Sequence, residues 1–353
     1  MDSNYQRSDN ELVHALSTIT AWHSFWDPRI LSHPLRPLVQ KYYGRVVTKC
    51  IRKELDKRFT EMQQEKRSPE AKTKRAKSVI ALALEAYMAD HQKETNKLDD
   101  DFAQYATYQI RLFLFAGNDT TSSSIVYVYH MLAKHPKALA KIRQEHDTIF
   151  SPDISAAAHL IKTNPALLNQ CPYTLAVIKE TLRLFPPASS TRQGLDNITL
   201  TDRHGNAYPL DRTMGAEIIH PAIQKNPRIW PRAEEFVPER WLVNPGHELY
   251  PNPAAWRPFE QGPRNCIGQT LVYNEMRIVL VMTVRMFDIK PAYDEWDALN
   301  SDKRGVLSKL AVWMGVANQI KHVNGERAYQ SEKAGTHPAD GYPCRVSLVP
   351  GQS

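Results

Sequence analysis

Apolar residues recur at intervals of three and four along most of the chain, which predicts a mainly helical protein. Residues 1–35 predict a helix followed by a loop that prolines interrupt. The same periodicity predicts longer helices over residues 39–64, 78–88, 97–134, 173–184 and 269–287. No internal repeat is present, so the pattern describes a globular fold and not an array.

The helix predicted over residues 97–134 is the longest and is apolar on almost every side. Its core stripe is spaced at threes and fours and comprises Ile110, Phe113, Leu114, Gly117, Thr121, Ile125, Val128, Tyr129 and Leu132. A helix that is hydrophobic all round is normally buried. We therefore expect this helix to run through the core and to end at His135-Pro136.

The pattern changes after Pro187. Residues 188–219 alternate short extended runs with turns, which predicts a small β-sheet. Residues 220–265 are rich in proline and aromatic residues and predict a long ordered loop. The end of the chain predicts a hairpin between residues 309–314 and 344–349. The fold class is therefore mainly α with small β-sheets.

Composition narrows the functional class. The 353 residues carry a net charge of +7, which suits an acidic partner protein or an anionic membrane surface but does not require nucleic acid. The charged stretch 63–77 has no interleaved aromatic residues for base stacking, so a solvated loop is favoured over a nucleic-acid site. No window has the roughly 20 apolar residues of a membrane span. The cysteines are spread too widely for a disulfide framework or a zinc site, which favours a reducing compartment.

One decapeptide carries the main chemical signal: Phe259-Glu-Gln-Gly-Pro-Arg-Asn-Cys-Ile-Gly268. It predicts a tight loop that presents Cys266 at the start of a helix, where the helix dipole and Arg264 favour a thiolate. Gly262 and Gly268 permit backbone geometry and close approach that a Cβ would block. We expect the ring of Phe259 to shield the sulfur. A buried structural cysteine and a heme ligand are the two interpretations that this loop leaves open.

The loop matches F-x-x-G-x-R-x-C-x-G at all five fixed positions, and in this it resembles the heme-binding signature of the cytochromes P-450. The resemblance implies the fold of that family, heme b (iron protoporphyrin IX) as cofactor, and Cys266 as the axial ligand of the heme iron. It also implies that Phe259 and Gly268 contribute to the cofactor site. The implied activity is that of a monooxygenase acting with O2 on an apolar organic substrate.

The middle of the long helix reads Ala116-Gly-Asn-Asp119-Thr120-Thr-Ser122, which is a poor helix-forming string. Ser and Thr side chains there can bond to backbone carbonyls and open the helix locally. A plain kink is one interpretation. The string also resembles the family's A/G-G-x-D/E-T-T/S motif for oxygen activation. That resemblance implies that Thr120 bonds to the reacting oxygen and that Asp119 supplies protons.

The helix over residues 173–184 contains Glu180 and Arg183, which are three residues apart and share one face. Glu180 is a candidate general acid, but a structural ion pair is the favoured interpretation. The two residues resemble the family's E-x-x-R, and Arg240 in Pro238-Glu-Arg-Trp241 resembles the third member of that network. The resemblance implies that the network fixes the loop carrying the cysteine.

Heme propionates require cations. Arg264 within the signature is one candidate, and Arg192 matches the position of a second propionate-binding arginine in the family. His220 is interpreted as an ordinary loop histidine. The sequence has no phosphate-binding glycine loop and no dinucleotide fingerprint, so electrons must arrive from another protein, which the resemblance identifies as an NADPH-dependent flavoprotein reductase.

The resemblance extends over residues 27–353, and residues 1–26 are an uncertain N-terminal segment. Finer similarity lies in Gln261-Gly-Pro-Arg-Asn-Cys-Ile-Gly268 and in the tail segments Gly325-Glu-Arg-Ala-Tyr329 and Tyr342-Pro-Cys-Arg345. In these the chain resembles fungal enzymes of secondary metabolism, such as the sterigmatocystin-type monooxygenases of polyketide pathways. We interpret the domain as the C-terminal two-thirds of the family fold, without the N-terminal anchor, sheet and first helices. Family members are anchored to the endoplasmic reticulum facing the cytosol, so the location of this chain stays open. The alternative to an active monooxygenase is a truncated, inactive heme-binding fragment.

Overall fold

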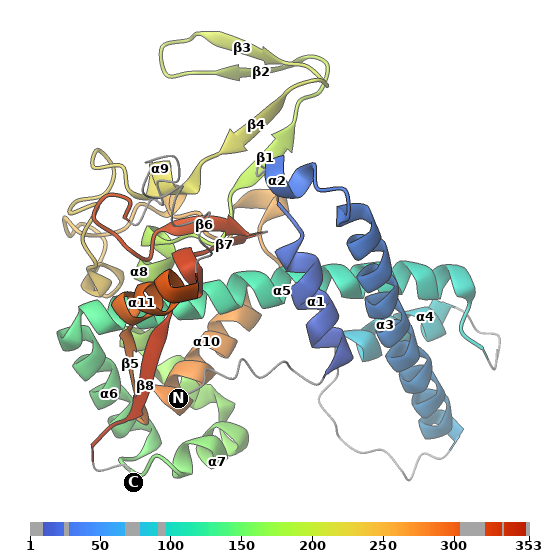
Figure 1. Ribbon diagram of the computed structural model, residues 1–353, viewed down its shortest axis with the longest axis horizontal. Helices are drawn as coiled ribbons and strands as arrows, with labels where there is room; N and C mark the ends of the chain where they lie inside the picture. Colours follow the sequence, from blue (N-terminus) through green and yellow to red (C-terminus); the bar gives the residue numbers. More distant parts are fainter. Residues whose placement is uncertain are drawn as a thin grey trace. The chain divides into compact units, whose positions relative to one another are not determined.

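Helices form most of the structure, and the strands occur only in pairs, which confirms the mainly α class with small β-sheets. The computed structural model describes residues 10–24, 28–67, 78–90, 97–303, 322–333 and 335–350. The chain divides into two compact units, Met1–Asp119 and Thr120–Ser353. The ribbon in Figure 1 gives the element labels used below.

The first unit is entirely helical in its described part. Its elements are α1 (Glu11–Ala21), α2 (Pro28–Leu31), α3 (Arg36–Arg67), α4 (Val79–Asp90) and the first part of α5 (Asp100–Lys134). Asn10 caps α1, because its side-chain oxygen accepts hydrogen bonds from the backbone N–H groups of Leu12 and Val13 at 3.0 and 3.3 Å.

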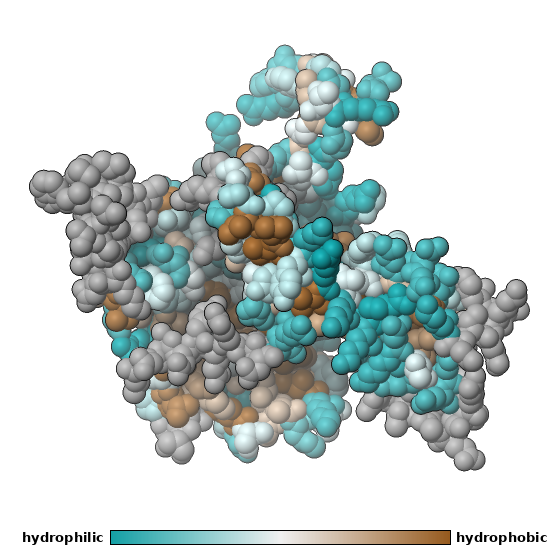
Figure 2. All heavy atoms as spheres, turned by 45° about the vertical axis from the view of Figure 1, so that its right-hand side comes forward, coloured by the Kyte–Doolittle hydropathy of each residue, from teal (hydrophilic) through white to brown (hydrophobic). Residues whose placement is uncertain are grey.

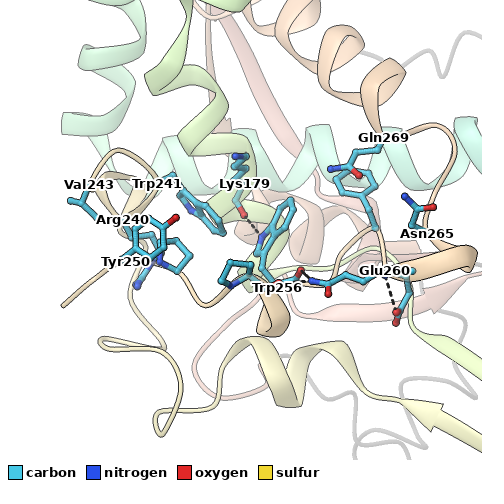
Figure 3. A pocket seen from close by; sticks show the side chains of 14 residues that line it. Lys179, Arg240, Trp241, Val243, Tyr250, Trp256, Glu260, Asn265 and Gln269 are labelled. Atoms are coloured by element: carbon cyan, nitrogen blue, oxygen red, sulfur yellow. Dashed lines mark hydrogen bonds between the residues drawn. The ribbon is translucent and has the colours of Figure 1, made fainter. Parts of the chain in front are cut away.

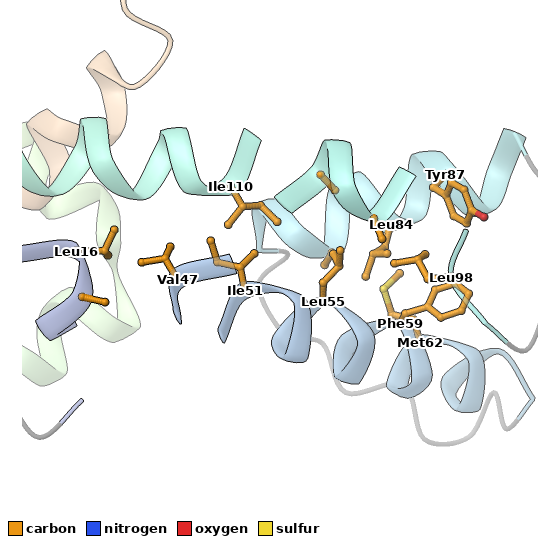
Figure 4. Close-up of a cluster of buried hydrophobic side chains, with 14 of the residues drawn as sticks. Leu16, Val47, Ile51, Leu55, Phe59, Met62, Leu84, Tyr87, Leu98 and Ile110 are labelled. Carbon is orange, nitrogen blue, oxygen red and sulfur yellow. The ribbon is translucent and has the colours of Figure 1, made fainter. Parts of the chain in front are cut away.

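The core of the first unit is a row of apolar side chains between these helices (Figure 4). Val47, Ile51, Leu55 and Phe59 follow one another at intervals of four along α3, so they share one face. They meet residues of α1, α4 and α5, including Leu16, Leu84 and Ile110. The amphipathic pattern predicted for residues 39–64 is therefore the face that α3 buries.

The second unit begins within α5 and adds most of the remaining helices. These are α6 (Pro136–Phe150), α7 (Ala156–Thr163), η2 (Pro165–Gln170), α8 (Pro172–Leu184), α9 (His220–Gln224), η3 (Pro238–Trp241), η4 (Pro253–Ala255), η5 (Gly262–Arg264), α10 (Gln269–Thr283) and α11 (Tyr293–Lys303). The main core cluster of this unit joins α5, α6, α8 and α10 through residues such as Leu132, Ile142, Ile178 and Met276. This cluster places the start of α10 on a closely packed support.

Two antiparallel ladders replace the single small sheet expected over residues 188–219. β1 (Ser190–Gln193) pairs with β4 (Gly215–Ile218), and β2 (Ile198–Thr201) pairs with β3 (Ala207–Leu210). The β1–β4 ladder leads into the β2–β3 hairpin (Figure 1). A third ladder joins β6 (Gln330–Lys333) to β7 (Gly335–Pro338).

The hairpin expected at the end of the chain stays a prediction, although its second strand is present. β8 (Cys344–Leu348) pairs antiparallel with β5 (Phe287–Pro291), and Ile289 lies opposite Val346. The first strand of the expected hairpin, residues 309–314, lies outside the described residues. The pairing that forms joins segments more than 50 residues apart, which local patterning does not reveal.

The long helix α5 is continuous from Asp100 to Lys134, but it is not buried along its whole length. Leu112 and Phe113 are 60% and 45% exposed, whereas Val128 and Leu132 are buried. The expectation of a helix buried throughout therefore holds only for its C-terminal half.

Hydrophilic side chains dominate much of the surface that Figure 2 shows, with apolar side chains gathered in separate patches. Among the described helices, none combines the length and the hydropathy that crossing a membrane requires.

Candidate functional site around Cys266

The loop before α10 has a tight backbone that presents Cys266 at the surface. The backbone N–H of Cys266 donates to the carbonyl of Phe259 at 2.8 Å, which closes the loop. Glu260 and Gly262 have positive φ angles of 56° and 78°. A positive φ costs glycine least, which explains the residue at position 262. The thiol of Cys266 is exposed, so the interpretation as a buried structural cysteine is wrong.

Gly268 differs from what the sequence predicts. Its φ is −85°, and it serves as the N-cap of α10. A Cβ built there would lie 3.7 Å from the Sγ of Cys266, which is an ordinary van der Waals contact. The protein itself therefore leaves room for a small side chain at position 268, although that side chain would contact the thiol of Cys266.

Apolar side chains stand beside the exposed thiol. Ile267 is 80% exposed and Leu271, in the first turn of α10, is 68% exposed. Phe259 is directed into the core instead, where its ring centroid lies 5.2 Å from that of Tyr273 and 6.1 Å from that of Trp256. Phe259 therefore supports the loop from its core side. Ile267 and Leu271 next to an exposed thiol suit a large apolar ligand bound through sulfur.

Glu180, Arg183 and Arg240 come together in a fully buried network. Arg183 donates to both carboxylate oxygens of Glu180, at 2.8 and 3.0 Å. Arg240 donates to the same carboxylate through Nε at 3.0 Å. The indole of Trp241 and the backbone N–H of Val237 also donate to it, each at 3.0 Å. The network fixes η3 against α8.

Gln224 extends this network toward the cysteine loop. Its amide nitrogen donates to the carbonyls of Leu182 and Arg183, each at 3.0 Å. Its amide oxygen accepts from the backbone N–H of Arg257 at 2.7 Å, two residues before Phe259. A buried amide whose donors and acceptor are all used rigidifies its neighbours. The base of the loop is thus joined to α8 by direct hydrogen bonds.

His220 is the residue that sequence reasoning missed. Its Nδ1 lies 2.8 Å from the carbonyl of Ala188, and its Nε2 lies 2.6 Å from the carboxylate of Glu260. Both ring nitrogens are therefore engaged, one by a backbone carbonyl and one by a carboxylate. His220 is a buried side chain bonded to the loop that presents the thiol, and not an ordinary loop histidine.

Glu260 has a second partner in Arg257, whose guanidinium donates to the other carboxylate oxygen at 2.5 Å. Desolvation alone would raise the pKa of Glu260, but the hydrogen bonds from Arg257 and His220 outweigh it and lower the pKa to about 2. The carboxylate is therefore ionised at neutral pH. These contacts stabilise Glu260 in its positive-φ backbone conformation.

A cavity of about 530 Å³ lies against the loop, on the side that does not carry the thiol of Cys266. Figure 3 shows Trp241 and Trp256 on its lining, with the indole N–H of Trp256 donating to the carbonyl of Lys179 at 3.3 Å. Of the described residues, Cys266 is not among those that line this cavity. A ligand bound to the sulfur would therefore lie elsewhere, on the exposed side of the loop.

The two arginines predicted to bind propionates are not engaged in ion pairs with described residues. Arg264 is exposed in η5. Arg192 lies in β1 and donates to the hydroxyl of Ser190 at 2.5 Å and the carbonyl of Thr191 at 3.1 Å. Both guanidinium groups therefore keep their charge available for an anionic ligand.

Asp119 and Thr120 lie in α5 at the junction between the two units. Asp119 is 6% exposed and Thr120 is half-buried. The hydroxyl of Ser124 donates to the carbonyl of Thr120 at 2.8 Å, which is the side-chain contact with the backbone that the sequence predicts. The helix is continuous through this string, and a kink stays one alternative interpretation.

The residues around Cys266 fit a heme. The exposed thiol offers an anionic sulfur ligand, Ile267 and Leu271 offer apolar contact, and Gly268 leaves the sulfur uncrowded. Arg264 and Arg192 offer cations for carboxylate groups. A heme has the same three properties: an iron that accepts a thiolate, an apolar macrocycle and two propionates.

Comparison with known proteins gives a consistent result. The family model for cytochrome P450 matches residues 1–311. Cytochrome P450 monooxygenase polC of Polytolypa hystricis is 41% identical over 354 residues, which cover 98% of this chain and 59% of the relative. Cytochrome P450 monooxygenase acrF of Aspergillus aculeatus is 30% identical, with 89% of this chain and 62% of the relative covered. Cytochrome P450 3A13 of Mus musculus is 29% identical, with 80% and 53% covered. The chain thus spans about three-fifths of the length of its fungal relatives.

Proposed function

Because the chain belongs to the cytochrome P450 family, we propose that it forms the heme-bearing part of a monooxygenase. This enzyme would insert one oxygen atom of O2 into a C–H bond or a double bond of an apolar organic substrate. The observation that carries the proposal is the exposed thiol of Cys266, held at the head of α10 on a loop anchored to α8. The fungal relatives support a place in fungal secondary metabolism.

The residues of the proximal side would bind and orient the cofactor. Cys266 would ligate the heme iron through Sγ, and Arg264 and Arg192 would hold the propionates. When bound, the heme supplies the chemistry that activates dioxygen. Ile267 and Leu271 would cover apolar parts of the macrocycle and exclude water from the sulfur. The buried network around Glu180 would keep the loop in place without taking part in the reaction.

On α5, the proposal assigns proton transfer to Asp119 and Thr120. The Oγ1 of Thr120 would hold a proton at the reacting oxygen, and the carboxylate of Asp119 would replenish it. Asp119 directly precedes Thr120 on α5, so the two side chains belong to the same turn of that helix.

The proposed electron donor is an NADPH-dependent flavoprotein reductase. The sequence carries no fingerprint for a flavin or nicotinamide site, so both electrons must come from a partner. The net charge of +7 favours association with an acidic protein surface.

A carbon monoxide difference spectrum tests the proposal. Full-length protein loaded with heme, reduced with dithionite and exposed to carbon monoxide should show the red-shifted Soret band of a thiolate ligand. Cys266→Ser should lose this band, and Cys344→Ser, which changes another exposed cysteine, should keep it. Failure to bind heme, or an unshifted band in the wild-type chain, would rule out a heme-thiolate site. Loss of the band in both variants would indicate damage to the fold and not the loss of a ligand.

A further inference from the structure

A second, smaller cavity of about 350 Å³ lies between η2 and α10. Its lining comprises Pro165, Ala166, Leu168, Asn169, Thr270, Tyr273, Asn274 and Arg277. None of these described residues is acidic, and Arg277 is the only cation among them. Thr270, Asn274 and Arg277 are spaced at four and three along α10, so they share one face of that helix. The cavity therefore has a partly apolar lining that carries polar groups and a single positive charge.

Arg277 is buried without a counter-charge. It is 8% exposed and forms no ion pair with the described residues. Its Nη1 donates to the side-chain oxygens of Asn169 and Asn274, at 3.3 and 3.4 Å, and both distances are long for such bonds. Its Nε–H has no hydrogen-bond partner in the described part of the chain. A buried cation in this state is costly unless an anion compensates it.

The next buried arginine on the same segment, Arg285, also has unpartnered nitrogens but does have a counter-charge. Arg285 is 3% exposed and contacts the carboxylate of Asp147 at 3.1 Å and the carbonyl of Ser151 at 2.5 Å. Arg277 has two neutral amide oxygens where Arg285 has a carboxylate and a carbonyl. The difference leaves the charge of Arg277 available for an anion that enters the cavity.

The other polar groups of the lining are suited to the same ligand. Burial raises the pKa of Tyr273, so its phenol stays protonated and can donate a hydrogen bond. Thr270 adds a hydroxyl, and the amide oxygens of Asn169 and Asn274 already accept from Arg277, which leaves their NH₂ groups as donors. The site thus combines a guanidinium with neutral donors on two elements.

We propose that this cavity binds a phosphate group, either free or at the end of a larger molecule. A guanidinium binds two oxygens of a phosphate in parallel, and the phenol, hydroxyl and amide donors would reach the remaining oxygens. A carboxylate has only two oxygens and would leave some of these donors unused. Among the described residues, Cys266 does not line this cavity, and Tyr273 meets the cysteine loop only through the ring of Phe259, so either proposal can fail while the other stands.

Titration calorimetry on the full-length chain tests the site with inorganic phosphate, glycerol 3-phosphate and acetate at constant ionic strength. Saturable binding of phosphate is expected, and Arg277→Met should weaken it about tenfold or more, because a charge-assisted hydrogen bond is lost. Arg212→Met removes the same charge from an exposed pair with Asp196 and should leave binding unchanged. Tighter binding of inorganic phosphate indicates a free ion, and tighter binding of glycerol 3-phosphate indicates the end of a larger molecule.

Asn274→Leu provides a second variant if Arg277→Met fails to fold, and it should also weaken phosphate binding. Absence of saturable binding, or equal affinity in the wild-type chain and in both cavity variants, would overturn the proposal. Acetate binding as tightly as phosphate would overturn the assignment to phosphate.

Discussion

At the scale of single residues, Glu180 is the carboxylate around the site that accepts the most hydrogen bonds. Arg183, Arg240, Trp241 and the backbone of Val237 all donate to it, and its side chain is fully buried. Removing one partner of a buried ion pair leaves the others as uncompensated charges. The stability of the second unit therefore depends on this carboxylate more than on any exposed ion pair near it.

Glu180→Gln should lower the free energy of unfolding by about 3–5 kcal/mol, because two buried guanidinium groups lose their counter-charge. Urea denaturation measures the change. Glu239→Gln is the matched control, since Glu239 is 44% exposed and its pair with Lys141 should contribute about 1 kcal/mol or less. Equal effects of the two substitutions would contradict the structural role of Glu180.

The ionised carboxylate of Glu260 leads to a prediction about how the stability of the fold depends on pH. Its contacts with Arg257 and His220 lower its pKa from 4.5 to about 2, so the folded chain favours the ionised form. The stability that this carboxylate contributes is fully present above pH 4.5 and is lost as the pH falls through about 2. Thermal melts of the wild type and of Glu260→Gln should differ at pH 6 and converge near pH 2. A difference that stays constant over this range would show that Glu260 is not responsible.

The residues of the site differ in how far the sequence could predict them. Glu180 and Arg183 are three apart on one helix, so their pairing follows from local geometry. His220 could not be found in this way, because its partners Ala188 and Glu260 lie 32 and 40 residues away. Only the folded chain brings them together, and nothing in the local sequence marks His220 as a partner of the cysteine loop.

At the scale of elements, helices with a long apolar stripe were predicted well. α3, α8 and α10 form close to residues 39–64, 173–184 and 269–287, because each buries one periodic face. The pairing of β5 with β8 was not predictable, since strands this short carry no signal for their partner. The exposed stretch of α5 around Phe113 escaped prediction because an apolar pattern alone does not show which neighbours cover it.

The motif of α5 can be tested within that helix. Thr120→Ala should leave the carbon monoxide spectrum intact but divert electrons to peroxide, because proton delivery to the reacting oxygen fails. Peroxide formed per NADPH consumed measures this loss, with a reductase and a substrate present. Thr121→Ala is the control, since Thr121 is 1% exposed and its hydroxyl has no hydrogen-bond partner among the described residues. Coupled turnover by Thr120→Ala equal to that of the wild type would refute the role.

At the scale of the whole molecule, the two units bury separate sets of residues. The core of the first unit contains residues from Ala15 to Ile110, and the clusters of the second contain residues from Tyr127 to Tyr342. Cys266, the network around Glu180 and the phosphate cavity all belong to the second unit. Asp119, to which the proposed function assigns proton supply, is the last residue of the first unit.

Because the two units have separate cores, we expect a destabilising substitution in one unit to leave the other unit folded. Leu55 is fully buried on α3, and Leu55→Ala should cost about 2–5 kcal/mol through the cavity it leaves. Hydrogen exchange followed by mass spectrometry should show faster exchange in peptides from residues 10–119 and little change in peptides from residues 125–342. Leu82→Ala on α4 is the control, since Leu82 is 51% exposed and its truncation leaves no buried cavity. Because the heme ligand lies in the second unit, Leu55→Ala should also keep the thiolate-type Soret band. A loss of protection spread evenly over both units would instead show that the two cores unfold as one.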